Sequence, residues 1–138
     1  MAEAVDFHDY TIESLLVEAK VRRLVLRAFD EHAPGSPSLV AEFSGLAGYC
    51  LLGDVLGTIV FELEERDPVD LYRQFAPQLQ AAYSNSGGHD PWVDTEDGAV
   101  AFLAANRIRG FELSSSVGAY GAIWCREFKK WVEPDGTA

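Results

Sequence analysis

The chain has 138 residues, 48% of them hydrophobic, and a formal net charge of −11. This length is typical of one domain that buries its own core, and the hydrophobicity excludes disorder for most of the chain. Acidic residues outnumber basic ones 22 to 11, which disfavours direct binding to nucleic acids or anionic membranes, because both require cations to neutralise phosphates. We expect a single domain over residues 1–138, with poor order only at residues 1–6 and 132–138.

The chain shows no signal for a membrane or for an export route. No stretch reaches the roughly 18 apolar residues of a membrane span, and the acidic start has no apolar signal core. These features predict a soluble, cytoplasmic protein. Cys50 and Cys125 are far apart in the sequence, each in an apolar setting, so we expect buried thiols rather than a disulfide or a zinc site.

The first half of the chain carries patterns typical of strands. Residues 10–19 and 24–29 predict two strands joined by a short polar connection, and hence a hairpin. A loop rich in proline, glycine and serine precedes a third strand at residues 39–43. Residues 44–49 are interrupted by glycines and give no clear pattern. Residues 58–64 alternate between apolar and polar side chains and predict a fourth strand.

A helix is predicted after this strand. Asp67 is placed to be its N-cap and Pro68 its first residue, a combination typical of helix starts. Apolar residues then follow helical spacing as far as Tyr83. Pro77 lies inside this segment, so we expect a kink or two short helices.

A second helix is predicted after a loop that ends near Pro91. Asp94 or Thr95 can cap it, its body spans residues 99–105, and Asn106 is a plausible left-handed terminator. Two further strands are expected at residues 110–114 and 122–131.

The predicted order is therefore β-β-β-β-α-α-β-β. Short connections between strands favour an antiparallel sheet. We expect an α+β fold with a largely antiparallel sheet of about six strands and both helices packed on one of its faces.

Acidic side chains are concentrated around the predicted helices. Residues 54–97 contain ten acids against two arginines. An acidic surface usually serves solubility, but it can also attract a basic protein partner. The residues expected to contact such a partner are Glu64, Glu65, Asp67, Asp70, Asp90, Asp94, Glu96 and Asp97.

Trp92 lies in a polar loop beside these acids and could anchor the same interface. The alternative is a tryptophan packed over the start of the second helix, and the sequence does not separate the two.

No catalytic or metal-binding pattern stands out. The doublets His8-Asp9 and His89-Asp90 resemble pieces of metal sites, but such sites need more ligands than three histidines supply here. Glu62 and Glu64 share a strand face, yet they lie in a run of charges typical of a solvated surface. We expect no cofactor, no metal and no catalytic residue, and the sequence leaves open whether the two doublets lie close in space.

Three short motifs carry a family resemblance: Phe7-His8-Asp9-Tyr10-x-Ile12, then Glu42-Phe43-Ser44-Gly45-Leu46, then Ile59-Val60-Phe61-x-Leu63-Glu64. In them the chain resembles small bacterial β-rich proteins, some of which are grouped with immunity proteins of polymorphic toxin systems. The resemblance covers roughly residues 7–65 and implies no cofactor and no catalytic residue.

Two function classes follow. The first is a non-enzymatic, immunity-like protein that presents an acidic surface to a basic protein partner. The alternative is a small-molecule binder or small enzyme with a pocket between the sheet and the helices. A housekeeping structural protein is a third reading. A deep pocket with convergent polar groups would separate the second class from the first.

Overall fold

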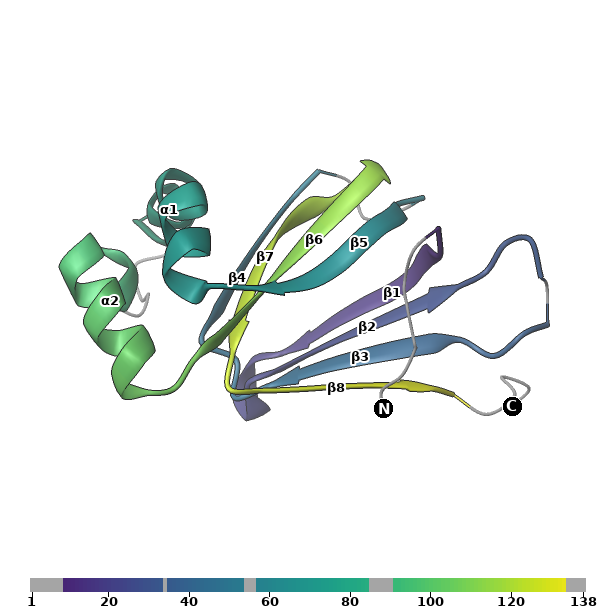
Figure 1. The fold of residues 1–138 in the computed structure, drawn as a ribbon, viewed down its shortest axis with the longest axis horizontal. Coiled ribbons are helices and arrows are strands. Elements are labelled where there is room, and N and C mark those ends of the chain that lie inside the picture. Colours follow the sequence, from purple (N-terminus) through teal and green to yellow (C-terminus); the bar gives the residue numbers. More distant parts are fainter. Residues whose placement is uncertain (1–8, 34, 54–56, 85–90, 134–138) are drawn as a thin grey trace.

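The computed structural model describes residues 9–33, 35–53, 57–84 and 91–133 (Figure 1). Its elements follow the chain in this order: β1 (Thr11–Glu18), β2 (Arg23–Phe29), β3 (Leu39–Ser44), β4 (Gly48–Leu52), β5 (Ile59–Arg66), α1 (Pro68–Ser84), α2 (Glu96–Ala105), β6 (Arg109–Val117), β7 (Tyr120–Cys125) and β8 (Glu127–Val132). Short 3-10 turns occur at Ala19–Val21 and Pro91–Val93. The expected α+β class is confirmed.

The strands form one eight-stranded sheet in the order β4-β7-β6-β5-β1-β2-β3-β8. Every neighbouring pair is antiparallel, including the predicted hairpin of β1 and β2. The sheet has two more strands than expected, because β4 was not predicted and the single strand predicted over residues 122–131 is divided into β7 and β8.

The bends lie where β3 passes into β4 and where β7 passes into β8. The β3–β8 pairing continues as the β4–β7 pairing on the other side of the bends. The amide of Ala47 donates to the carbonyl of Trp124 (2.8 Å), and the amide of Arg126 donates to that of Ser44 (3.1 Å). The predicted strand over residues 122–131 is therefore two strands, and the unassigned residues 44–49 form a bend and the start of β4.

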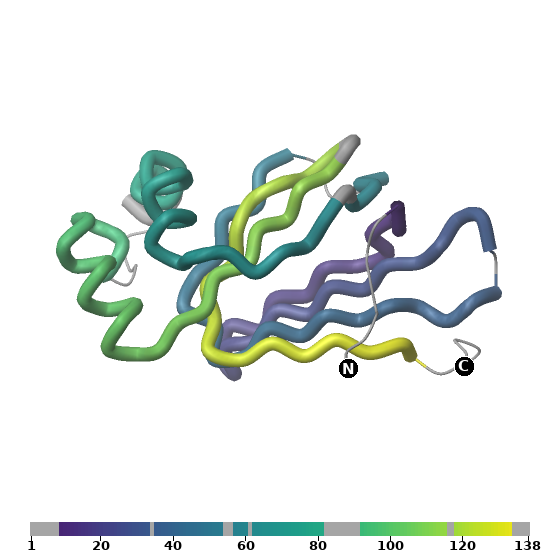
Figure 2. The backbone as a smooth tube through the Cα atoms, in the orientation of Figure 1, coloured from purple at the N-terminus to yellow at the C-terminus, as the bar shows by residue number. Residues whose placement is uncertain are grey.

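Because of these bends, the two halves of the sheet face each other (Figures 1 and 2). One half consists of β4, β7, β6 and β5, and the other of β1, β2, β3 and β8. The main core cluster lies between them. Its aromatic centre is formed by Phe43, Phe111 and Phe128, whose ring centroids are 4.5 to 5.5 Å apart.

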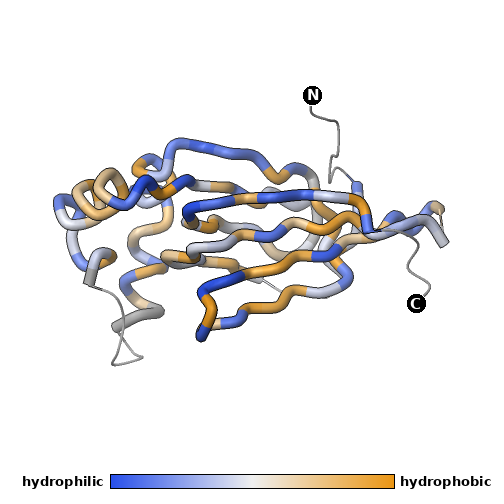
Figure 3. Tube along the Cα trace, turned by 90° about the horizontal axis from the view of Figure 1, so that it is seen from below, coloured by the Kyte–Doolittle hydropathy of each residue, from blue (hydrophilic) through white to orange (hydrophobic). Residues whose placement is uncertain are grey.

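The helices cover the outer face of the first half, near β4, β6 and β7 (Figure 1). This confirms the prediction of two helices on one face. Strand β7 serves two clusters, since alternate residues of a strand point to opposite faces. Ile123 and Cys125 belong to the core between the halves, whereas Ala122 and Trp124 pack beneath the helices. Elsewhere in the sheet, hydrophobic and hydrophilic residues alternate along the backbone (Figure 3).

Helix α1 is anchored at its first residue. The indole of Trp124 donates to the carbonyl of Pro68 (3.0 Å). Gly110 lies under the same point, and a Cβ atom there would lie 2.9 Å from the Cα of Pro68. A glycine in β6 therefore allows the helix to start in direct contact with the sheet.

Several expectations about the ends of elements are corrected. A kink or two short helices were predicted at Pro77; helix α1 runs through this residue as one helix, so the second of these alternatives is wrong. Asn106 ends α2 with a φ of −102°, and the left-handed residue is Arg107 instead.

The expectation of poor order at the C-terminus is wrong for its first two residues. Val132 belongs to β8, and the carboxylate of Glu133 lies 3.0 Å from the guanidinium of Arg27. The remaining terminal residues of that expectation, 1–6 and 134–138, lie outside the described residues.

Both cysteines of the chain are free and buried, as predicted. Burial raises the pKa of the Cys50 thiol, and it raises the pKa of Cys125 to about 12. Neither thiol is ionised near neutral pH. Within the described segments, no helix has the length and apolar character to cross a membrane.

Candidate functional site

A pocket of about 680 Å³ opens where the two bends of the sheet meet helix α2. This volume lies within the ~300–1,000 Å³ range of small-molecule sites. Its walls come from the β1–β2 connection, both bends, α2 and the segment that leads into β6. The lining residues are Arg22, Gly45, Leu46, Ala47, Trp92, Gly98, Phe102, Asn106, Ile108 and Arg126.

The base of the pocket is apolar and partly aromatic. Leu46, Ala47 and Ile108 are buried there. Trp92 is stacked on Phe102, with ring centroids 5.3 Å apart and an interplanar angle of 9°. The indole N–H of Trp92 donates to the carbonyl of Ala47 (3.3 Å), which fixes the ring across the bend. A rigid indole at this place gives the pocket a preformed wall.

Polar groups converge on the pocket from three separate parts of the chain. Arg22 follows the 3-10 turn between β1 and β2, Arg126 lies at the β7–β8 bend, and Asn106 ends α2. The guanidinium of Arg126 donates to the side-chain oxygen of Asn106 (3.0 Å). The amide of Asn106 donates to the carbonyl of Phe102 (2.9 Å), which holds the side chain in place.

Arg126 differs from most arginines of this protein in its surroundings. Ion pairs with carboxylates occupy Arg23, Arg27, Arg66, Arg73 and Arg109. Arg126 and Arg107 have no carboxylate within ion-pair distance among the described residues, and both line a smaller depression of about 370 Å³ that adjoins the pocket. Glu127 also lines that depression. Two arginines without an ion pair among the described residues thus line this depression, in a protein whose net charge is −11.

The left-handed backbone of Arg22 marks the β1–β2 connection. Its φ is 56°, a conformation that costs a residue with a side chain about 1–2 kcal/mol. The carbonyl of Arg22 accepts a hydrogen bond from the amide of Leu46 (3.0 Å). This contact ties the connection to the bend and places the arginine at the pocket.

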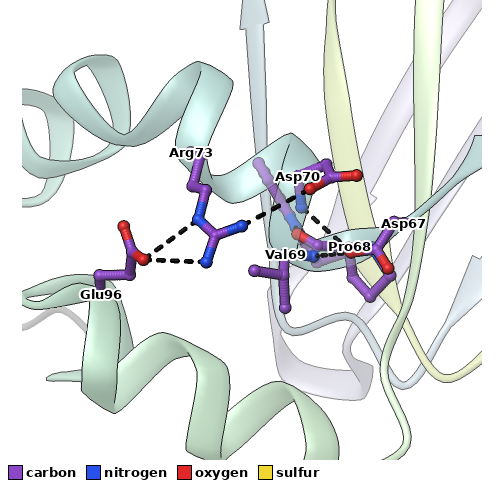
Figure 4. A network of polar contacts seen from close by, with 7 residues as sticks. Asp67, Pro68, Val69, Asp70, Arg73 and Glu96 are labelled. Atoms are coloured by element: carbon purple, nitrogen blue, oxygen red, sulfur yellow. Dashed lines mark hydrogen bonds and ion pairs between the residues drawn. The ribbon is translucent and has the colours of Figure 1, made fainter.

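Three of the predicted acidic residues around the helix starts, Asp67, Asp70 and Glu96, belong to one network of polar contacts (Figure 4). Asp67 accepts hydrogen bonds from the amides of Val69 and Asp70 and is the N-cap of α1, as predicted. Arg73 lies 3.7 Å from Asp70 and 3.0 Å from Glu96, and so joins α1 to the first turn of α2. All three of these charged side chains are more than half exposed, so their ion pairs contribute little to stability.

Glu64 and Glu65 point to opposite faces of β5. Glu65 forms a two-pronged pair with Arg109 at 2.9 Å, and the hydrogen bonds of this pair lower the pKa of Glu65. Glu64 lies opposite Glu112, beside the outer face that α1 covers. These two predicted residues therefore do not share one surface.

Three predicted residues remain. Asp94 and Asp97 are exposed near the start of α2, and the carbonyl of Asp94 accepts from Gln80 (3.3 Å). Asp90 lies outside the described residues, and so do His8 and His89. The distance between the two His-Asp doublets is therefore not described by the structure.

Trp92 is not exposed. Its side chain is only 5% accessible and packs with Tyr72, Phe102 and Trp124. The expectation that it anchors a partner from the surface is wrong, and the alternative of a tryptophan packed over the helix start holds. Its surroundings are apolar because α1, α2 and β7 meet there.

Among the residues that the structure describes, no group of three or more potential metal ligands occurs. Sequence reasoning missed the polar residues that line the pocket, because Arg22 lies roughly 80 to 100 positions before Asn106 and Arg126, which are themselves 20 positions apart. One signal was available: Arg126 and Glu127 interrupt an otherwise apolar run from Ala122 to Phe128.

Comparisons with family models, curated proteins and solved structures gave no match to this chain.

Proposed function

We propose that this protein binds a small organic molecule in the pocket between the bends of the sheet and α2. The observation that carries the proposal is the convergence of polar groups from three elements on an apolar cavity of about 680 Å³. A pocket with an apolar base and a few fixed polar groups is typical of ligand sites. The proposal takes up the second function class that the sequence left open.

Phe102 offers the sharpest test, because it is half-buried, lines the pocket and lies on the side of α2 that faces it. The experiment screens a library of small charged and neutral compounds by thermal shift on three proteins: the wild type, Phe102→Ala and Val100→Ala. Val100 is exposed on the same helix and is not part of the pocket.

We expect compounds that raise the melting temperature of the wild type and of Val100→Ala, but not that of Phe102→Ala. Removing the phenyl ring deletes apolar contact area that a bound ligand would cover. If no compound in the library raises the melting temperature in a way that depends on Phe102, the proposal is contradicted.

A second candidate function is the acidic protein-binding module. The observation that favours it is the arrangement in Figure 4, where Asp70 and Glu96 flank the single cation of Arg73. Asp97 adds a third exposed carboxylate in the first turn of α2. Such a surface would speed encounter with a basic partner.

This candidate is tested by a pull-down, in which the immobilised protein captures partners from a host lysate at low and at moderate salt. Replacing Asp70, Glu96 and Asp97 by the corresponding amides should abolish the salt-sensitive capture of a basic protein. Capture that is unchanged by these substitutions would count against an acidic interface.

A further inference from the structure

The pocket also indicates the chemical class of what it binds. We propose that its ligand is an amphipathic anion, with an oxyanionic head group held by Arg126 and an apolar body that lies against Phe102 and its neighbours. This inference rests on the proposed function, and it adds the charge and shape of the ligand.

The case for an anionic head begins with the cation that reaches the pocket. A guanidinium donates several N–H groups in a fixed fork that matches a carboxylate or a phosphate. In Arg126 one terminal nitrogen donates to Asn106, a neutral acceptor. Because no carboxylate lies within ion-pair distance in the described part of the chain, the positive charge of Arg126 is not balanced by an ion pair there.

The position of the guanidinium is fixed from both ends. The stem of Arg126 lies along Gly45, where an added Cβ would lie only 2.8 Å from the Cβ of Arg126. Its amide bonds to the carbonyls of Ser44 and Gly45, and Asn106 holds the tip. Such a positioned donor loses little side-chain entropy when it binds an anion.

The apolar body follows from the rest of the wall. Leu46, Phe102 and Ile108 line the same cavity and offer no charged group. The indole N–H of Trp92 already donates to the carbonyl of Ala47, so this ring presents apolar surface. A small inorganic anion would leave most of a 680 Å³ cavity unfilled, which favours a molecule that carries its charge at one end.

The acidic character of the protein is relevant to where an anion can bind. With a net charge of −11, the chain as a whole repels anions. An anion is attracted by local positive charge, and Arg126 brings such a charge to the pocket, which Arg22 also lines. Glu127 lies on the side of the smaller depression, so the head group is expected between Arg126 and Arg22.

The test uses two pairs of probes that differ only in charge: octanoate with octanamide, and 2-naphthoate with 2-naphthamide. Binding to the full chain is measured by isothermal titration calorimetry. We expect each carboxylate to bind roughly 10- to 100-fold tighter than its amide, which corresponds to charge-assisted hydrogen bonds to an arginine. Octyl phosphate serves as a third anion, and its affinity relative to octanoate decides whether the head is a phosphate or a carboxylate.

Substitutions of Arg126 test whether the anionic probes bind at this side chain. Arg126→Gln should reduce the affinity of the anions roughly 10- to 100-fold without changing that of any amide that binds. Arg126→Lys keeps the charge but loses the fork, so its effect should be intermediate. Arg73→Gln is the matched control, because this arginine is exposed, belongs to the network of Figure 4 and does not line the pocket. Arg126 is itself exposed, and circular dichroism checks that its variants stay folded.

Three outcomes would overturn the inference: amides that bind as tightly as the carboxylates, anion binding that Arg126→Gln leaves unchanged, or no binding by any of the probes. None of them overturns the proposed function, which is decided by the dependence of library compounds on Phe102. Conversely, a library without any such compound would remove both.

Discussion

At the scale of single residues, Gly121 leaves almost no room for a side chain. A Cβ atom there would lie 1.8 Å from the carbonyl oxygen of Cys50 on the neighbouring strand β4. Gly121→Ala must therefore push β4 away from β7, and we expect a loss of at least about 2 kcal/mol in the free energy of unfolding. Urea denaturation measures this loss.

Gly35 provides the matched control for this substitution. Its φ is also positive, at 87°, but nothing lies within 4 Å of an added Cβ. Gly35→Ala should cost only about 1 kcal/mol, which is the conformational penalty alone. Equal losses at the two positions would mean that β4 gives way to the new methyl group without cost.

At the scale of elements, the start of α1 depends on the Asp67 cap. The carboxylate of Asp67 accepts from the amides of Val69 (2.8 Å) and Asp70 (3.1 Å). We expect Asp67→Ala to lower the free energy of unfolding by about 1 kcal/mol, and Asp67→Asn to lower it much less, because an amide oxygen can still cap the helix.

The control for the cap is Asp97→Ala in the first turn of α2. That helix is capped by Thr95, whose hydroxyl accepts from the amide of Gly98. Asp97 therefore contributes only through the helix dipole, about 0.3 kcal/mol. If Asp67→Ala costs no more than Asp97→Ala, the cap seen in Figure 4 does not stabilise the helix.

The elements also explain what the sequence could predict. Alternation over residues 58–64 and the Asp67-Pro68 pair are local signals, and both led to the right element. The bends were not predictable, because they depend on pairing between β3 and β8 and between β4 and β7, far apart in the chain. Glycines at 45 and 48 obscured the strand pattern there, so the number of strands was too low.

The same limit explains why the residues of the candidate site were not predicted from the sequence. Acidic residues are visible in the sequence as a cluster, whereas Arg22, Asn106 and Arg126 come together only when the bends and α2 meet. Trp92 had polar sequence neighbours, yet the structure packs it against Phe102 and Trp124. The residues next to a side chain in the sequence predict its surroundings only where they are also its neighbours in the folded structure.

At the scale of the whole molecule, β7 joins the two hydrophobic clusters into one cooperative unit. Its residues alternate between the core of the facing halves and the cluster beneath the helices. Neither cluster can lose its order without exposing one face of β7 to water. We therefore expect the sheet and the helices to unfold in a single transition, as most domains of this size do.

Two signals separate the clusters experimentally. Trp92 and Trp124 belong to the cluster beneath the helices, so their fluorescence reports on it once the exposed Trp131 is replaced by phenylalanine. Far-UV circular dichroism reports on the whole sheet. In urea, the two midpoints should coincide in the Trp131→Phe protein.

The decisive variant adds Phe43→Leu, which lies in the other cluster and is fully buried. This change should lower the free energy of unfolding by about 1 kcal/mol and shift both midpoints equally, because a buried aromatic ring is replaced by a smaller apolar side chain. A shift in the circular dichroism midpoint without a shift in fluorescence would mean that the helices and their cluster unfold on their own.

The pocket lies at the boundary between the two clusters, where Leu46 belongs to one and Trp92 to the other. In a cooperative molecule, a ligand bound there stabilises both clusters at once, so its binding should raise the two midpoints together.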